Sequence, residues 1–138
     1  MQARVKWVED LTFIAEAPSG HTVLMSAGEN SGGKDSCLRP MEMLMLAVGG
    51  CASIDVISIL KKSRQTVTDC EVKITGERND GTPAYFTAMH CNFVVTGKGL
   101  SDKQVKRAVD LSFDKYCSVS FTLKGTTDIT WDYVIVEG

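Results

Sequence analysis

The segment RPMEMLMLAVGGCASIDVISILKK, residues 39–62, constrains the fold more than any other part of this chain. Pro40 suits the first turn of a helix, where a backbone N–H is not needed. Residues 41–60 are mostly good helix formers or apolar, and Lys61 and Lys62 complement the negative end of a helix dipole. We therefore predict one long helix from Pro40 through Lys62.

The first half of this helix is apolar on nearly every face, which is typical of a helix that is buried all round. In a chain of 138 residues, one sheet can cover only one side of such a helix. The simplest cover for the other side is the same helix from a second copy of the chain. The sequence therefore predicts an obligate homodimer.

Composition narrows the class of protein. Hydrophobic residues make up 43% and charged residues 23% of the chain, which predicts a single globular domain over residues 1–138. The net charge of −2 offers no basic surplus for nucleic acid. No apolar run follows Arg4 and Lys6 as a signal peptide would require. The longest uncharged apolar run, residues 43–54, is too short to cross a bilayer. We expect a soluble, cytoplasmic protein with neither a membrane nor a nucleic-acid partner.

Alternation of apolar and polar residues predicts the strands. Three short strands are expected in about the first thirty residues, and further strands over residues 70–79, 86–95 and 127–136. The Asn79-Asp80-Gly81 sequence is a strong turn signal between two of them. In the strand from Phe86 to Val95, one face carries Met89, Cys91, Phe93 and Val95.

A second helix is expected after Gly99, where Ser101 and Gln104 have the spacing of a capping box. A bend at Cys117 and a short helical turn stopped by Gly125 follow it. The order of the main elements is then βββ-α-ββ-α-β. This order predicts an α+β domain with an antiparallel sheet.

The cysteines carry the chemical signal. Their number is odd and no export signal is predicted, so a disulfide scaffold is disfavoured. No two of them have a C-x-x-C spacing and the only histidines are His21 and His90, so we expect no metal site. The five cysteines are Cys37, Cys51, Cys70, Cys91 and Cys117.

Cys51 directly follows Gly49 and Gly50 inside the predicted long helix. A glycine within a helix costs about 1 kcal/mol relative to alanine, so two in succession need a reason. Close packing of the helix against a neighbour is one reason. The other is that bare backbone lets a substrate or a second helix approach the sulfur. Both are compatible with a position at a dimer axis.

Cys117 lies at the end of the second predicted helix, where the chain can move. A cysteine is most often a small buried apolar side chain. We apply that interpretation to Cys70 and Cys91, which alternate into the apolar faces of their strands, and we place Cys37 in an exposed loop. Position alone does not pair Cys51 with Cys117.

The stretches LRPMEMLMLAVGGCASIDVISIL and DKYCSVSFTL resemble the OsmC/Ohr superfamily, and the MQARVKW start is similar to its YhfA-like branch. The resemblance covers essentially the whole chain. It implies a domain-swapped homodimer in which antiparallel sheets wrap around two long central helices.

Characterised members of the superfamily reduce organic hydroperoxides with a pair of cysteines. The resemblance therefore implies that Cys51 is the peroxidatic cysteine and Cys117 the resolving one. A dithiol would recycle their disulfide, and no bound cofactor is required because sulfur performs the redox chemistry. This reading places the chain in hydroperoxide detoxification during oxidative stress.

In the family an arginine and a carboxylate activate the attacking thiol, and Arg39 and Glu42 are the local candidates. Glu42 lies nine residues before Cys51, about 13 Å along the helix and on its opposite face. An antiparallel partner helix would be needed to bring a second Glu42 across. Family peroxidases have Pro-Glu at the helix start, whereas this chain has Pro40-Met41. Glu42 is equally interpreted as a first-turn carboxylate stabilised by the helix dipole, and Asp55 as a polar contact near the helix end.

Two other functions remain open at this point. A non-catalytic protein of the same fold would bind an apolar small molecule between two subunits and keep both thiols reduced. A thiol redox sensor would form the disulfide without turnover. The methionine at position 41 favours the first of these alternatives.

Overall fold

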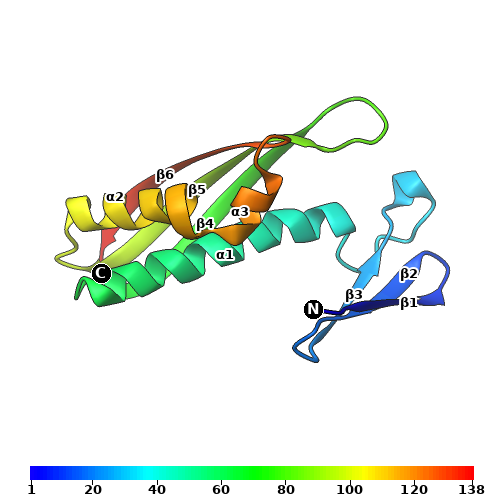
Figure 1. Ribbon diagram of the computed structural model, residues 1–138, viewed down its shortest axis with the longest axis horizontal. Helices are drawn as coiled ribbons and strands as arrows, with labels where there is room; N and C mark the ends of the chain where they lie inside the picture. The colour runs from blue at the N-terminus through cyan, green and yellow to red at the C-terminus, as the bar shows by residue number, and fades with distance from the viewer. The chain divides into compact units, whose positions relative to one another are not determined.

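Two compact units make up the chain, Met1–Leu44 and Met45–Gly138, in the computed structural model of residues 1–138. The predicted α+β class is confirmed, as Figure 1 shows. The strands are β1 (Arg4–Glu9), β2 (Thr12–Glu16), β3 (Thr22–Ser26), β4 (Thr66–Arg78), β5 (Phe86–Lys98) and β6 (Asp128–Glu137). The helices are α1 (Pro40–Lys62), α2 (Asp102–Leu111) and α3 (Ser118–Leu123), with short turns η1 (Glu29–Ser31) and η2 (Ser112–Tyr116).

The first unit is built on the predicted meander. Strands β1, β2 and β3 form an antiparallel sheet in which Phe13 of β2 pairs with Trp7 on one side and Met25 on the other. The chain then passes through a loop that contains η1. A single parallel bridge between Met25 and Leu38 leads it to the start of α1 at Pro40.

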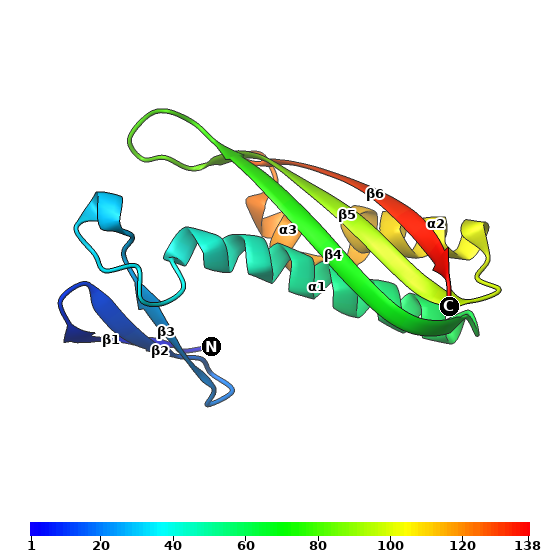
Figure 2. The ribbon, with the colours of Figure 1, turned by 180° about the vertical axis from the view of Figure 1, so that it is seen from behind.

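The second unit is a three-stranded sheet, in the order β4-β5-β6, with its helices on one face (Figures 1 and 2). The predicted inner face of β5 is confirmed, because Met89, Cys91, Phe93 and Val95 are at most 1% exposed. The helices cover this face with fully buried small and branched side chains. These are Val48, Ala52, Val56 and Leu60 of α1 and Val105, Ala108 and Val109 of α2.

One strand departs from the antiparallel arrangement predicted for the sheets. Strands β4 and β5 are antiparallel, but β6 runs parallel to β5, from the pair Ala88–Asp128 to the pair Gly97–Glu137. Parallel neighbours need a crossover connection. Here α2, η2 and α3 form it, returning the chain to the level at which β5 began.

The second helix is shorter than its apolar spacing suggested. Regular α2 ends at Leu111, and residues 112–116 form a wider turn of π-helical type before the chain bends at Cys117. The prediction of a capping box is wrong. Ser101 lies at the N-cap position of α2, but its side chain makes no cap hydrogen bond. Gln65 accepts the Ser101 N–H at 2.8 Å in place of Gln104.

Helix α1 has two different faces within one chain, so the prediction of burial all round is not met by the chain alone. At Gly49 an added Cβ would lie 2.4 Å from Cδ1 of Ile74 on β4, so this glycine allows close contact with the sheet. At Gly50 an added Cβ would meet nothing within 4 Å. Leu46 and Ile54, one turn to either side of Gly50, are 53% and 72% exposed.

By length and composition α1 is the one helix that could cross a membrane, with a mean hydropathy of 2.1 over its most apolar window. The expectation that this segment is too short to cross a bilayer was based only on the uncharged run of residues 43–54. In the structure the helix extends well beyond this run. A core helix of a water-soluble protein passes the same test. The face carrying Val48, Ala52 and Val56 is packed in the core of the second unit.

Candidate active site

The structure brings Cys51 and Cys117 together, although they are far apart in the sequence. Their sulfurs lie within 4.8 Å of each other, and both thiols are unbonded. Cys51 is half-buried in the middle of α1, beside the open backbone of Gly50. Cys117 is only 3% exposed and lies where η2 ends and α3 begins. The two sulfurs therefore differ in their access to solvent.

The sulfur of Cys117 is positioned by the bend between η2 and α3. Its backbone N–H donates to the carbonyl oxygen of Ser112 at 2.6 Å, which closes the wide turn. As the N-cap of α3, its Sγ accepts the backbone N–H of Ser120 at 3.5 Å. The Ser120 hydroxyl donates back to the Cys117 carbonyl at 3.0 Å. The bend predicted at Cys117 thus directs its side chain into the core.

Asp55 is a third member of this site, and it was not among the predicted site residues. A carboxylate oxygen of Asp55 lies within 4.8 Å of both sulfurs. The Ser112 hydroxyl donates to its Oδ2 at 3.1 Å. The available signal was spacing: Asp55 follows Cys51 by four residues, which places both on one face of a helix.

Burial controls the protonation of the inner thiols. It raises the pKa of Cys117, while hydrogen bonds from Ser120 oppose the rise and the neighbouring Cys51 adds to it. Cys91 is also buried here, and burial with the nearby Cys117 raises its pKa to about 11. Near neutral pH Cys117 and Cys91 therefore carry their protons.

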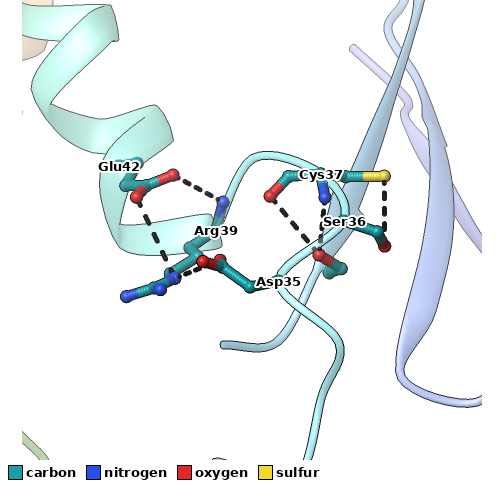
Figure 3. Close-up of polar contacts among 6 residues, drawn as sticks. Asp35, Ser36, Cys37, Arg39 and Glu42 are labelled. Carbon is teal, nitrogen blue, oxygen red and sulfur yellow. Dashed lines mark hydrogen bonds and ion pairs between the residues drawn. The ribbon is translucent and has the colours of Figure 1, made fainter. Parts of the chain in front are cut away.

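Arg39 and Glu42, the predicted activating residues, form a cluster in the first unit (Figure 3). The Arg39 Nε donates to Asp35 at 2.8 Å and lies 4.0 Å from Glu42. Glu42 also accepts the backbone N–H of Arg39 at 2.9 Å. This last bond is that of a first-turn carboxylate, the alternative interpretation of Glu42. Asp35 raises the pKa of Arg39, which in turn lowers the pKa of Asp35.

Neither of the remaining cysteines joins the pair. Cys37 is half-buried rather than exposed as predicted, and its sulfur contacts Ser36 on the side of the loop away from the Arg39 guanidinium (Figure 3). Cys70 is half-buried on β4, where burial, reinforced by Asp69, raises its pKa. The position of Cys70 fits the structural role given to it.

A cleft of about 390 Å³ reaches Asp55 from the surface of the second unit. Apolar side chains of Ile59 and Leu111 line it together with Tyr116. Lys62 and Arg107 also line it, and neither is engaged in an ion pair. The cleft gives small molecules a route toward the carboxylate.

The donor set of this site suits thiol chemistry better than a bound metal. Structural zinc sites are usually closed by four ligands, often cysteines from paired short spacings. Here Cys51, Asp55 and Cys117 come from scattered positions, and the carboxylate already accepts Ser112. We therefore interpret the cluster as a thiol pair with a carboxylate beside it.

Comparisons of this chain with a family model and with known proteins agree on one family. Residues 33–132 match the family model described as OsmC-like protein. Protein YhfA of Escherichia coli K12 is 54% identical over 136 residues, which are 99% of this chain and 98% of that protein.

Solved structures give the same fold. One from structural genomics is 53% identical, with full coverage of both chains and a TM-score of 0.91. An organic hydroperoxide resistance protein OsmC from Legionella pneumophila has a TM-score of 0.74. Its sequence is 13% identical, with coverage of 98% of this chain and 96% of that one. The resemblance inferred from the sequence motifs is thereby confirmed.

Proposed function

Since this chain belongs to the OsmC-like family, we propose that it is a cysteine-based peroxidase that reduces organic hydroperoxides. The observation that carries the proposal is the approach of two free thiols from distant parts of the chain to within 4.8 Å. One protein that shares the fold is an organic hydroperoxide resistance protein. The proposed setting is the cytoplasm, in defence against oxidative stress.

The surroundings of the two sulfurs suggest their roles. Cys51 is the more accessible and borders open space at Gly50, so it is the sulfur that a peroxide can reach. Its thiolate would attack the terminal peroxide oxygen and break the O–O bond, which leaves a sulfenic acid on Cys51. The proton lost by the Cys51 thiol would go to the departing alkoxide, which leaves as an alcohol. Cys117 would then attack that sulfur, forming the disulfide and releasing water. A small dithiol or a dithiol protein would restore both thiols.

Arg39 and Glu42 are proposed to assist the first step. A cation beside a thiol favours the thiolate, which is the reacting form. The Arg39 guanidinium remains protonated and is already joined to two carboxylates. In the proposed homodimer, these residues would act on Cys51 across the interface between the two copies.

The homodimer itself is proposed from the uncovered face of α1. Leu46, Gly50 and Ile54 follow one another at intervals of four residues and so form a single exposed stripe. A second copy of α1 crossing at Gly50 could approach the backbone closely because no side chain intervenes there. This contact would place two copies of Cys51 near the interface.

The test is peptide mass spectrometry of reduced protein after one equivalent of cumene hydroperoxide, compared with hydrogen peroxide. We expect a Cys51–Cys117 disulfide that forms faster with the organic peroxide and is reversed by a dithiol. Cys51→Ser should abolish peroxide consumption, whereas Cys117→Ser should leave a sulfenic acid that dimedone traps on Cys51. Cys37→Ser is the matched control and should react as the wild type does.

Other results would favour the alternatives. Persistent free thiols at both positions would contradict a peroxidase and favour a binding protein for an apolar small molecule at the dimer interface. A disulfide that forms slowly and in substoichiometric yield would favour a redox sensor.

A further inference from the structure

Asp55 lies beside the thiol pair in the second unit, and the proposed peroxidase step by itself assigns it no role. Its carboxylate oxygen lies within 4.8 Å of the sulfurs of both Cys51 and Cys117. One helical turn separates it from Cys51 on α1. The Asp55 carboxylate therefore lies beside both sulfurs that would be joined in a Cys51–Cys117 disulfide.

Ser112, the first residue of η2, holds this carboxylate in place by a hydrogen bond. Its hydroxyl is fully buried, donates to Asp55 Oδ2 at 3.1 Å and lies 3.4 Å from the Ala52 carbonyl. The Ser112 carbonyl accepts the backbone N–H of Cys117. One residue thus connects the orientation of the carboxylate with the bend that carries Cys117.

The second half of the proposed reaction requires a proton to move. Cys117 is a buried thiol in its protonated form near neutral pH, and it must lose that proton to attack Cys51. The departing hydroxyl of the sulfenic acid must gain a proton to leave as water. A single group beside both sulfurs can perform both transfers.

We propose that Asp55 moves this proton, taking it from Cys117 and delivering it to the hydroxyl that leaves Cys51. The Cys117 S–H bond and the Cys51 S–O bond break, the S–S bond and one water molecule form, and Asp55 returns to a carboxylate. In this step the Cys117 sulfur is oxidised and the sulfenic sulfur of Cys51 is reduced, so no oxidant is needed beyond the peroxide of the first step. Ser112 is a positioning residue, since it acts through the carboxylate. The delivery of the proton to a leaving hydroxyl rests on the proposed function, because the peroxidase step creates that hydroxyl. The removal of the proton from Cys117 does not rest on the proposed function.

The inference predicts opposite effects on the two half-reactions. Asp55→Asn removes a negative charge beside Cys51, the sulfur that attacks the peroxide. Peroxide consumption by this variant is therefore expected to be equal to that of the wild type or faster. Formation of the disulfide is expected to be slowed by about a hundredfold, the usual effect of removing a positioned acid or base. Sulfenic acid should accumulate on Cys51 and be trapped by dimedone. A residue with a purely structural role would slow both steps together.

Matched variants make the comparison specific. Asp55→Glu keeps the carboxylate and should restore disulfide formation at least in part. Ser112→Ala should slow the second step less than Asp55→Asn does. Asp69→Asn, the same change beside the unpaired Cys70, should leave both steps unchanged.

A second arm separates this inference from the proposed function. Reaction with 4,4′-dithiodipyridine first forms a mixed disulfide on Cys51, and attack by Cys117 then releases a second pyridinethione that absorbs light. In a Cys37→Ser, Cys70→Ser background, Asp55→Asn should delay only the second release. If the wild type consumes no hydroperoxide but this delay is observed, the peroxidase proposal fails and the role of Asp55 stands. If Asp55→Asn closes the disulfide at the wild-type rate, the inference is overturned.

Discussion

The Cys91 thiol is a titratable group enclosed in the core of the second unit. Its side chain is 0% exposed on β5, and burial together with Cys117 raises its pKa from 9.0 to about 11. Below pH 9 this thiol is protonated in the folded and unfolded states, so its full contribution to stability is present. Between pH 9 and 11 only the unfolded chain releases the proton. Stability is therefore lost as the pH rises, by about 1.4 kcal/mol per pH unit.

The resulting prediction compares wild type with Cys91→Val, which keeps an apolar side chain of similar size. Between pH 8 and 10.5 the free energy of unfolding of the wild type should fall relative to that of the variant, by about 2 kcal/mol. Urea unfolding of the reduced proteins at several pH values measures this difference. Cys37→Ser controls for the removal of a thiol that is not enclosed in the core. A constant difference across the pH range would contradict the burial effect.

Contact between α1 and β4 depends on Gly49. An added Cβ there would lie 2.4 Å from Ile74 and 3.2 Å from Val72, closer than side chains approach each other. Overpacking of this kind costs about 1–3 kcal/mol, against about 1 kcal/mol gained from the helix preference of alanine.

Gly49→Ala is therefore expected to lower the free energy of unfolding by about 1 kcal/mol. Urea unfolding at neutral pH measures the change. Ser53→Ala, one turn later in the same helix, is expected to remain within about 0.5 kcal/mol of the wild type. A Gly49→Ala protein more stable than wild type would show that α1 does not need close approach to the sheet.

At the scale of helices and strands, the sequence was most informative where an element has a periodic pattern of apolar residues and one buried face. The long helix, the inner face of β5 and the meander were all predicted because alternation and helical spacing report burial directly. The parallel direction of β6 was not predicted, because pairing between two strands that are separated by three helical segments leaves no local pattern in the sequence. Asp55 was interpreted only as a polar contact near the helix end, because its partner Ser112 lies 57 residues away.

At the scale of the whole molecule, both units carry exposed apolar side chains, and α1 and β1 are among the elements that present them. In the second unit Leu46 and Ile54 are 53% and 72% exposed on one stripe of α1. In the first unit Val5, Trp7 and Val8 are exposed along β1. Exposed apolar surface of this extent is typical of an interface with another protein. A net charge of −2 provides little electrostatic repulsion between copies.

The last prediction concerns assembly. The wild type should sediment as a dimer, and Ile54→Glu should weaken dimerisation at least a hundredfold, because an unpaired carboxylate in an apolar interface costs several kcal/mol. Sedimentation velocity over a range of concentrations measures this change. Lys103→Glu, an acidic substitution on the exposed surface of α2, should leave the dimer intact. A monomeric wild type would remove the basis for placing Arg39 and Glu42 beside Cys51 of a second copy. Conversely, if the Ile54→Glu monomer keeps its inner thiol pair but loses its reaction with hydroperoxide, the peroxide-reacting site requires both copies.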